Sequence, residues 1–409
     1  MRRLLALTGV AALGLAACAP EPFIPAPYRS AEPVVEAGAP EATATAASRP
    51  EPTRAAGSAE ATGVADECRQ LAEDLTPEER VGQLFMVGVD TGGLDPATES
   101  AIRDSRVGSV VLLGNTTAGA NEIRKLTLRL GSFGTARVPL MGAVDQEGGT
   151  VQRLKGPGFS EIPSARDQGA MAPDDLEAAA AIWAGELKEA GIHYDLAPVG
   201  DLVPEAKQAT IEPIGRLKRD FGSDPALVSE AVVRFIGGMQ GQGLATSVKH
   251  FPGLGEVVTN TDFGAAEDTD VTRDSEHLEP FRAAIEAGVD SVMVSSAVFS
   301  QIDPDNEGVF SSAVITDLLR GDLGFDGVVI ADDLGAAAAV RTVEPAARAV
   351  RCIQAGGDIV INANPRIMQA MTSATLEAAE ADEEFAAQLT DSATRVLRLK
   401  SAVGLVNCG

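Results

Sequence analysis

The chain is short of the residues from which metal sites are usually built. It contains three histidines and four cysteines among 409 residues, with no CxxC pair and no cluster of histidine and cysteine. Such pairs and clusters are the usual sequence mark of zinc sites and dithiol redox centres. The sequence therefore gives no support for a metal site.

Positive charge is also scarce. The chain has 33 lysines and arginines against 59 aspartates and glutamates, which gives a formal net charge of −26 at pH 7. An excess of negative charge repels the phosphates of nucleic acids and the headgroups of anionic lipids. We expect neither as a partner, whereas the acidity itself says little about the substrate.

Beyond its first residues the chain lacks an apolar run long enough to cross a membrane. Arg2 and Arg3 precede an apolar stretch at residues 4–17, which is shorter than the roughly 20 residues that a spanning helix needs. A positively charged start before a short apolar run is typical of an export signal. Residues 1–17 are therefore predicted to be a signal peptide.

The end of this stretch indicates a lipid anchor. Leu15-Ala16-Ala17-Cys18 resembles a bacterial lipobox, in which cleavage precedes the cysteine and the cysteine is lipidated. The resemblance implies lipidation at Cys18 and an exported protein that is lipid-anchored to the outer face of the cell membrane. An ordinary secretory signal with an incidental cysteine is the alternative.

Residues 18–65 follow as a segment of a different composition. They are rich in proline, alanine, glutamate and threonine and have almost no large apolar side chains. Such a segment cannot bury enough apolar surface to offset the entropy lost on ordering. We expect a disordered tether between the anchor and a folded domain at residues 66–409.

Three cysteines remain in that domain, and their pairing is open. Cys68 lies near its start and Cys408 near its end, and the termini of a domain often lie close together. A Cys68–Cys408 disulfide would be stable outside the cytoplasm. Three free thiols are the alternative, and Cys352 is expected to be buried in a helix in either case.

Short apolar runs alternate with amphipathic stretches from residue 66 onward, which predicts an α/β fold. The runs read as strands lie at residues 82–89, 108–113, 140–144, 194–197, 245–248, 291–295, 327–330 and 358–361. Predicted helices include residues 173–190, 226–240, 278–287, 312–320, 344–355 and 383–400. Eight β-then-α units favour a single (β/α)8 TIM-type barrel. A doubly wound open sheet is the alternative, but no GxGxxG loop follows the first strand.

Charged residues collect directly after several of the predicted strands. Asp145 follows the third strand, Lys249 and His250 follow the fifth, and Asp332 and Asp333 follow the seventh. Each could separately be a surface turn or a helix cap. In a barrel, however, the C-terminal ends of the strands meet at one rim, where the active site lies. Charged groups beside glycine-rich turns suit a ligand rich in hydroxyl groups.

Four motifs in order resemble glycoside hydrolase family 3, in its single-barrel β-N-acetylhexosaminidase branch, from about Leu75 to Val403. The motifs are Val144-Asp145-Gln146-Glu147-Gly148-Gly149-x-Val151-x-Arg153, Arg219-x-Phe221-Gly222-Ser223-Asp224-Pro225, Lys249-His250-Phe251-Pro252-Gly253 and Gly324-Phe325-Asp326-Gly327-Val328-Val329-Ile330-x-Asp332-Asp333. Family-3 glucosidases and xylosidases usually add a second α/β domain after the barrel. Its absence from this chain favours the hexosaminidase branch.

The resemblance implies a retaining, exo-acting β-N-acetylglucosaminidase that works on cell-wall-derived or related amino-sugar glycosides. It makes Asp332 the nucleophile that forms a covalent glycosyl-enzyme. Five residues would hold the sugar on the non-reducing side of the scissile bond (the −1 sugar), namely Asp145, Arg153, Arg219, Lys249 and His250. It implies no metal and no organic cofactor, and we expect a monomer.

One departure from the family pattern concerns the general acid/base. The family usually reads Lys-His-Phe-Pro-Gly-His-Gly and then Asp-Ser-His, but this chain has Leu254 and then Asn260-Thr261-Asp262. Asp262 occupies the position of the missing histidine and is our candidate acid/base, with Glu256 as the second candidate. An isolated aspartic acid titrates near 3.9. Burial and the charge of Asp332 are expected to raise that pKa.

This departure leaves two other interpretations open. Phosphate or a second sugar could intercept the glycosyl-enzyme, which would make the protein a phosphorylase or a transglycosylase. Alternatively, the chain could be a sugar-binding lipoprotein that has lost turnover. The presence of Asp332 weighs against the second, because a binding protein has no need of a nucleophile.

Overall fold

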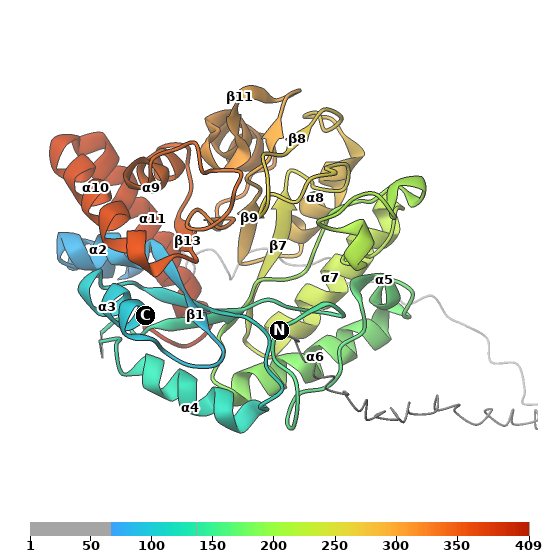
Figure 1. Cartoon of the computed structure of the whole chain (residues 1–409), viewed down its shortest axis with the longest axis horizontal. Coiled ribbons are helices and arrows are strands. Elements are labelled where there is room, and N and C mark those ends of the chain that lie inside the picture. The colour runs from blue at the N-terminus through green and yellow to red at the C-terminus, as the bar shows by residue number, and fades with distance from the viewer. Residues whose placement is uncertain (1–66, 136, 409) are drawn as a thin grey trace, which may run out of the picture. The chain divides into compact units, whose positions relative to one another are not determined.

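Eight parallel strands close into a barrel in the order β1-β13-β12-β9-β7-β6-β3-β2 (Figure 1). The computed structural model describes residues 67–135 and 137–408, so Cys18, the predicted signal peptide and the predicted tether lie outside the described residues. The strands are β1 (Phe85–Asp90), β2 (Ser109–Leu113), β3 (Met141–Val144), β6 (Tyr194–Asp195), β7 (Ala245–Phe251), β9 (Ser291–Val294), β12 (Val328–Ala331) and β13 (Ile359–Asn362). The predicted (β/α)8 barrel is confirmed.

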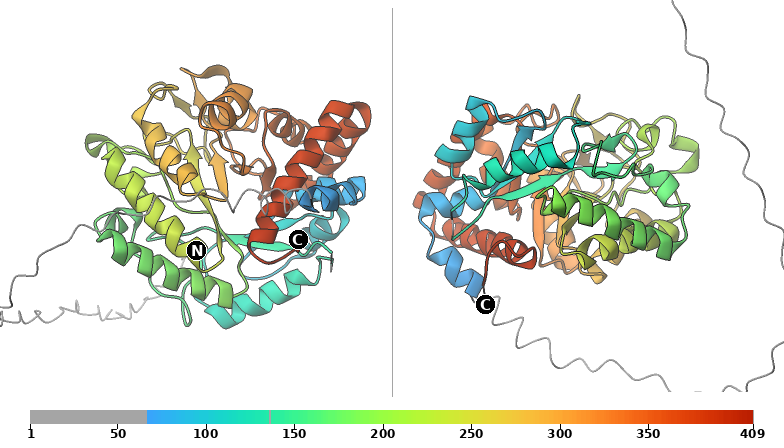
Figure 2. Two further views of the ribbon diagram at one scale, coloured as in Figure 1. Left: turned by 180° about the vertical axis from the view of Figure 1, so that it is seen from behind. Right: turned by 90° about the horizontal axis from the view of Figure 1, so that it is seen from below.

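Helices pack around the outside of the barrel, as the views from behind and below show (Figure 2). They are α2 (Pro77–Gln83), α3 (Pro96–Asp104), α4 (Ala120–Gly131), α5 (Ala165–Gln168), α6 (Pro173–Glu189), α7 (Pro225–Gly241), α8 (Glu279–Glu286), α9 (Pro345–Gln354), α10 (Met368–Ala381) and α11 (Glu383–Ala402). Several begin with proline after a side-chain cap. Asp224, for example, accepts hydrogen bonds from the Ala226 and Leu227 amides ahead of α7, which satisfies donors that the first turn leaves unpaired.

The strand and helix bounds differ from prediction by more than two residues, or in the type of helix, in three places. Gly82 and Gln83 belong to the end of α2 and not to the first strand. The helix predicted at residues 312–320 is a π-helix, η5 (Ala313–Asp322). β7 continues past its predicted end at Val248 to Phe251. Lys249 and His250 are polar, so the hydrophobic pattern did not include them in the strand, yet both are buried.

Several elements of only two to five residues were not predicted. They are the hairpin β4 (Gln146–Gly148) and β5 (Val151–Gln152), the small sheet β8 (Glu267–Asp268), β10 (Val298–Phe299) and β11 (Asp303–Glu307), and the 3₁₀ turns η1 (Glu205–Lys207), η2 (Gly215–Leu217), η3 (Glu276–Leu278), η4 (Gly308–Phe310) and η6 (Pro365–Ile367). All of them lie in connections between barrel strands and helices. Several of these connections carry the residues of the candidate site.

The N-terminal end of the barrel is closed by Lys400 of α11. Its ammonium group is buried and donates hydrogen bonds to Gln83 Oε1 at 2.7 Å, to the Gly108 carbonyl at 2.8 Å and to the Pro139 carbonyl at 3.0 Å. Burial lowers the pKa of this lysine to about 7. These acceptors lie just before β1, β2 and β3, so Lys400 occupies the N-terminal end of the barrel. The opposite, C-terminal end is the open one.

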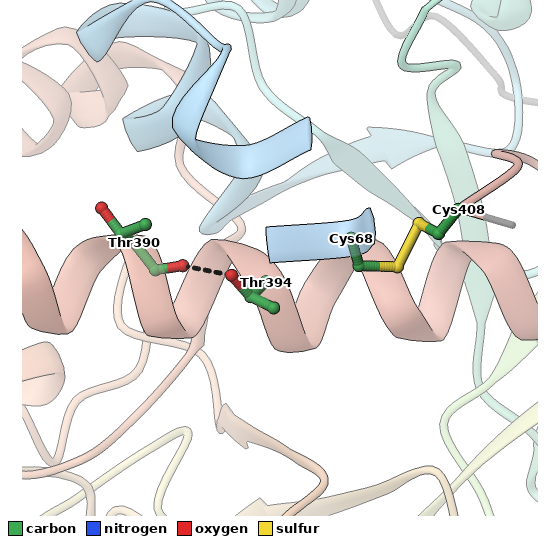
Figure 3. The surroundings of a disulfide bond; sticks show 4 residues. All are labelled: Cys68, Thr390, Thr394 and Cys408. Atoms are coloured by element: carbon green, nitrogen blue, oxygen red, sulfur yellow. Dashed lines mark hydrogen bonds between the residues drawn. A yellow bond between two sulfur atoms is a disulfide. The ribbon is translucent and has the colours of Figure 1, made fainter. Parts of the chain in front are cut away.

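A disulfide joins the two ends of the described chain. Cys68 and Cys408 are bonded across 340 residues, with their Cα atoms 4.9 Å apart (Figure 3). Of the two alternatives that the sequence left open, the disulfide is the one observed. Cys352 is a buried free thiol on α9, as expected. Among the described residues, no helix combines the length and apolar composition needed to cross a membrane.

Candidate active site

A cavity of about 400 Å³ opens at the C-terminal end of the barrel. The connections after β3, β6, β7 and β12 contribute its polar walls. All seven residues predicted for catalysis or sugar binding line it, namely Asp145, Arg153, Arg219, Lys249, His250, Asp262 and Asp332. Residues separated by almost 190 positions in the sequence therefore meet around one space of the size that small-molecule sites commonly have.

Three charged residues that line the cavity, Asp145, Arg219 and Lys249, belong to a network of ion pairs around the buried Glu147. Arg219 contacts both carboxylate oxygens of Glu147, at 2.8 and 2.7 Å. Lys249 lies 2.6 Å from Glu147 and 2.5 Å from Asp145. A carboxylate buried in this way is stable only with such partners. The network therefore fixes the directions of both cations and of Asp145 before any ligand arrives.

The charges of this network keep one another ionised. Burial alone would raise the pKa of Glu147, but the charges of Arg219 and Lys249 outweigh it and hold that pKa below its usual range. Burial alone would lower the pKa of Lys249, but Asp145 and Glu147 outweigh it and raise that pKa. The cavity thus presents fixed charges at neutral pH, which suits strong hydrogen bonds to sugar hydroxyls.

Asp201 orients His250 at the edge of the network. Its carboxylate accepts hydrogen bonds from the His250 ring nitrogen Nδ1 at 2.8 Å, from the His250 amide and from the Leu254 amide. With a proton on Nδ1, the ring nitrogen Nε2 is left as an acceptor, and it lies 3.4 Å from a terminal nitrogen of Arg219. The histidine is therefore held in one tautomer and one orientation.

Arg153 differs from the other cations of the cavity because it has no carboxylate partner among residues 67–135 and 137–408. It reaches Asn115 Oδ1 at 3.4 Å, and its buried Nε has no hydrogen-bond partner there. A buried guanidinium nitrogen without a partner is costly in the free protein. Arg153 thus has donors available for a ligand, whereas the donors of Arg219 are largely occupied by Glu147 and the Pro213 carbonyl.

The two adjacent acids after β12 have different surroundings. Asp333 accepts four hydrogen bonds, from the amides of Gly335, Ala336, Ala337 and Ala363. It therefore holds the turn in shape. Asp332 accepts one hydrogen bond, from the Asp333 amide at 2.8 Å, and its carboxylate is partly open to the cavity. Of the pair, Asp332 is the one with free lone pairs for a nucleophilic attack.

Asp262 lies on the connection after β7 and reaches the same cavity. The residue has access to solvent, but the surrounding walls partly desolvate its carboxyl group, and Asp332 and Asp333 add negative charge. Together these effects raise the pKa of Asp262 to about 6. About half of the group is then protonated at pH 6 and about a tenth at pH 7, which supplies the proton that a general acid gives.

Glu256, the second candidate for the acid, is placed elsewhere. Its carboxylate is paired with the Lys207 ammonium group, and it is absent from the residues that line the cavity. A carboxylate held by a lysine outside the cavity cannot reach a glycosidic oxygen inside it. The geometry favours Asp262.

Three buried acids of the site received no role from the sequence. Glu147 and Asp201 hold the cations and His250, as described above. Asp195 is fully buried and accepts a hydrogen bond from the Gln146 amide at 2.9 Å, and its pKa is raised to about 8, mainly by burial. Each of these acids ends a barrel strand or follows one, and this position in the sequence could have indicated that it belongs to the site. No cluster among the described residues has the three or more ligands that would hold a metal ion.

Replacement by alanine is expected to affect ligand binding at Arg153 and protein stability at Arg219. Arg153→Ala removes free donors, so we expect binding of N-acetylglucosamine to weaken about 10- to 100-fold with little change in stability. Arg219→Ala leaves the buried carboxylate of Glu147 with one of its two cationic partners, so we expect a loss of about 3–5 kcal/mol in the free energy of unfolding. Calorimetric titration and urea unfolding measure the two effects. Equal unfolding midpoints for Arg219→Ala and the wild type would contradict this division.

Comparison with known proteins identifies the family. The model of the glycosyl hydrolase family 3 N terminal domain matches residues 76–399. A beta-hexosaminidase of Stenotrophomonas maltophilia is 34% identical over 294 residues, which cover 70% of this chain and 84% of that protein.

Solved structures agree with this match. The beta-N-acetylhexosaminidase of Beutenbergia cavernae is 46% identical with a TM-score of 0.79, over 80% of this chain and 99% of that one. A family 3 beta-N-acetylglucosaminidase of Paenibacillus is 30% identical with a TM-score of 0.72, over 81% of this chain and 63% of that one. An eight-stranded barrel with these relatives and this cavity belongs to glycoside hydrolase family 3, and the protein is a glycoside hydrolase.

Proposed function

We propose that this protein is an exo-acting, retaining β-N-acetylglucosaminidase that forms a glycosyl-enzyme on Asp332. The observation that carries the proposal is the presence, in one cavity, of an accessible carboxylate and a carboxyl group whose pKa is raised to about 6. A retaining glycosidase needs such a pair, one ionised and one protonated. The cavity's fixed charges supply the groups that would bind the hydroxyls of one sugar.

The proposed mechanism has two steps. A carboxylate oxygen of Asp332 attacks the anomeric carbon while the bond to the aglycone oxygen breaks, and Asp262 gives its proton to that oxygen. Water then attacks the anomeric carbon, ionised Asp262 takes a proton from the water, and the sugar–Asp332 bond breaks. Lys249, Asp145 and Arg153 would hold the sugar during both steps.

The preference for an amino sugar rests on the relatives. The similar proteins are described as beta-hexosaminidases and a beta-N-acetylglucosaminidase. We extend that substrate class to this chain and propose that cell-wall fragments supply it. An exported enzyme anchored through Cys18 would meet such fragments at the outer face of the membrane. Incorporation of labelled fatty acid that survives Cys18→Ala would refute the anchor.

The function is tested by initial rates on paired chromogenic substrates. We expect the N-acetylglucosaminide to be hydrolysed well over tenfold faster than the matching glucoside, because the cavity would be shaped around the amino sugar. Comparable rates would assign the protein to another substrate class. A sugar 1-phosphate formed only with added phosphate would indicate a phosphorylase, and binding of N-acetylglucosamine without any hydrolysis would indicate a binding protein.

A further inference from the structure

Phe263 is the most conspicuous apolar side chain on the surface of the described chain. It is 83% exposed, more than any other large apolar residue among those described. It directly follows Asp262, yet it does not line the cavity that Asp262 lines. The ring is therefore exposed outside the cavity lining, on the residue next to the candidate acid. Single exposed apolar residues are common on proteins, and what sets Phe263 apart is its place beside Asp262.

The backbone holds Phe263 in this place. Its amide donates to the Asn260 carbonyl at 3.0 Å, and the Asp262 amide donates to Asn260 Oδ1 at 2.9 Å. The loop is also tied to the connection after β12, because the Ala338 amide donates to the Asp262 carbonyl at 3.2 Å. The exposed ring thus sits on a turn that is hydrogen-bonded both within itself and to the strand connection that carries Asp332.

The reaction places the aglycone next to this ring. A general acid must lie within hydrogen-bond reach of the oxygen that it protonates, so the glycosidic oxygen would lie about 3 Å from the Asp262 carboxyl. The aglycone is attached to that oxygen and leaves the cavity on the same side. The Cα atoms of Asp262 and Phe263 are about 3.8 Å apart, as in any trans peptide. Because the two residues are adjacent and the Phe263 ring is exposed, the first ring of the aglycone would come close to Phe263 if the ring turns toward the mouth of the cavity.

We propose that Phe263 is the platform on which the first aglycone ring stacks. The inference rests on the proposed function and adds its substrate class: glycosides whose aglycone offers a flat or apolar face, such as the C–H face of a pyranose. An aromatic ring buries such a face at little conformational cost, because Phe has only two side-chain torsions. Phe263 would then select among aglycones without touching the −1 sugar.

The test compares two N-acetylglucosaminides whose leaving groups are both alcohols, the methyl glycoside and N,N′-diacetylchitobiose. For Phe263→Ala we expect kcat/KM on the disaccharide to fall about 3- to 10-fold, mainly through KM, with the methyl glycoside changing less than about twofold. Phe263→Trp should retain the disaccharide activity. Leu227→Ala, which removes an exposed apolar side chain from α7, is the matched control and should change neither substrate. Inhibition by free N-acetylglucosamine should be the same in all four proteins.

Equal losses on both substrates, or no loss on the disaccharide, would overturn the role of Phe263 while leaving the proposed function intact. A wild-type enzyme that hydrolyses neither N-acetylglucosaminide would instead overturn the proposed function and this inference with it. The two failures are therefore distinguished by the wild-type rates alone.

Discussion

Replacing Asp332 by alanine is expected to reduce turnover by roughly 10⁴-fold or more, because the proposed covalent step would then have no nucleophile. The fold should survive the change. Asp332 accepts a single hydrogen bond, from the neighbouring Asp333 amide, so the free energy of unfolding should change by about 1 kcal/mol or less. Single-turnover rates and a urea unfolding curve measure the two quantities on the same preparation.

Covalent labelling identifies the nucleophile independently of rate. A 2-fluoro or 5-fluoro glycosyl inhibitor should trap the glycosyl-enzyme, and peptide mass spectrometry should place the label on Asp332. Asp333 is the built-in control, since four backbone amides occupy its carboxylate oxygens. A label on Asp333 or on Asp145 would show that the assignment is wrong.

The barrel was predictable because its strands are buried on both faces. Parallel strands in that setting are continuous apolar runs, and the run before Asp332 is a clear case, since all four residues of β12 are buried. The same signal failed where buried residues are charged. Lys249 and His250 extend β7 because Asp145 and Glu147 neutralise the lysine and Asp201 orients the histidine. No hydrophobic pattern in the sequence reveals partners that lie about 50 to 100 residues away.

The sequence predicted seven residues that line one cavity, but it did not predict how their contacts differ. The motifs assign both Arg153 and Arg219 to sugar binding. In the structure, Arg153 has a donor without a partner among the described residues, whereas Arg219 is hydrogen-bonded to Glu147. The disulfide is a similar case. Cys68 and Cys408 lie at opposite ends of the domain, and only the packing of the chain ends brings their Cα atoms within 4.9 Å.

Asp262→Asn should separate substrates by their leaving groups. An amide cannot donate a carboxylic proton, so hydrolysis of a natural disaccharide should fall by about 10²- to 10⁴-fold. An aryl glycoside with an acidic phenol needs little protonation, and its first step should be far less affected. For Asp262→Ala, added azide should restore part of the lost turnover and yield a glycosyl azide, because this anion attacks the glycosyl-enzyme without a general base. Glu256→Gln is the matched control, and it should lose only the ion pair with Lys207.

The pH profile tests the same residue through a different observable. Asp262 must be protonated to act as the acid, so kcat/KM should fall as pH rises through its pKa of about 6, the pKa that the free enzyme reports. An aspartic acid with the ordinary value near 3.9 would already be ionised well below neutrality. Desolvation by the cavity walls and the charges of Asp332 and Asp333 thus raise the pKa of this aspartate to a value close to that of an ordinary histidine. An alkaline limb that persists unchanged in Asp262→Asn, together with a collapse of disaccharide hydrolysis in Glu256→Gln, would transfer the role of acid to Glu256.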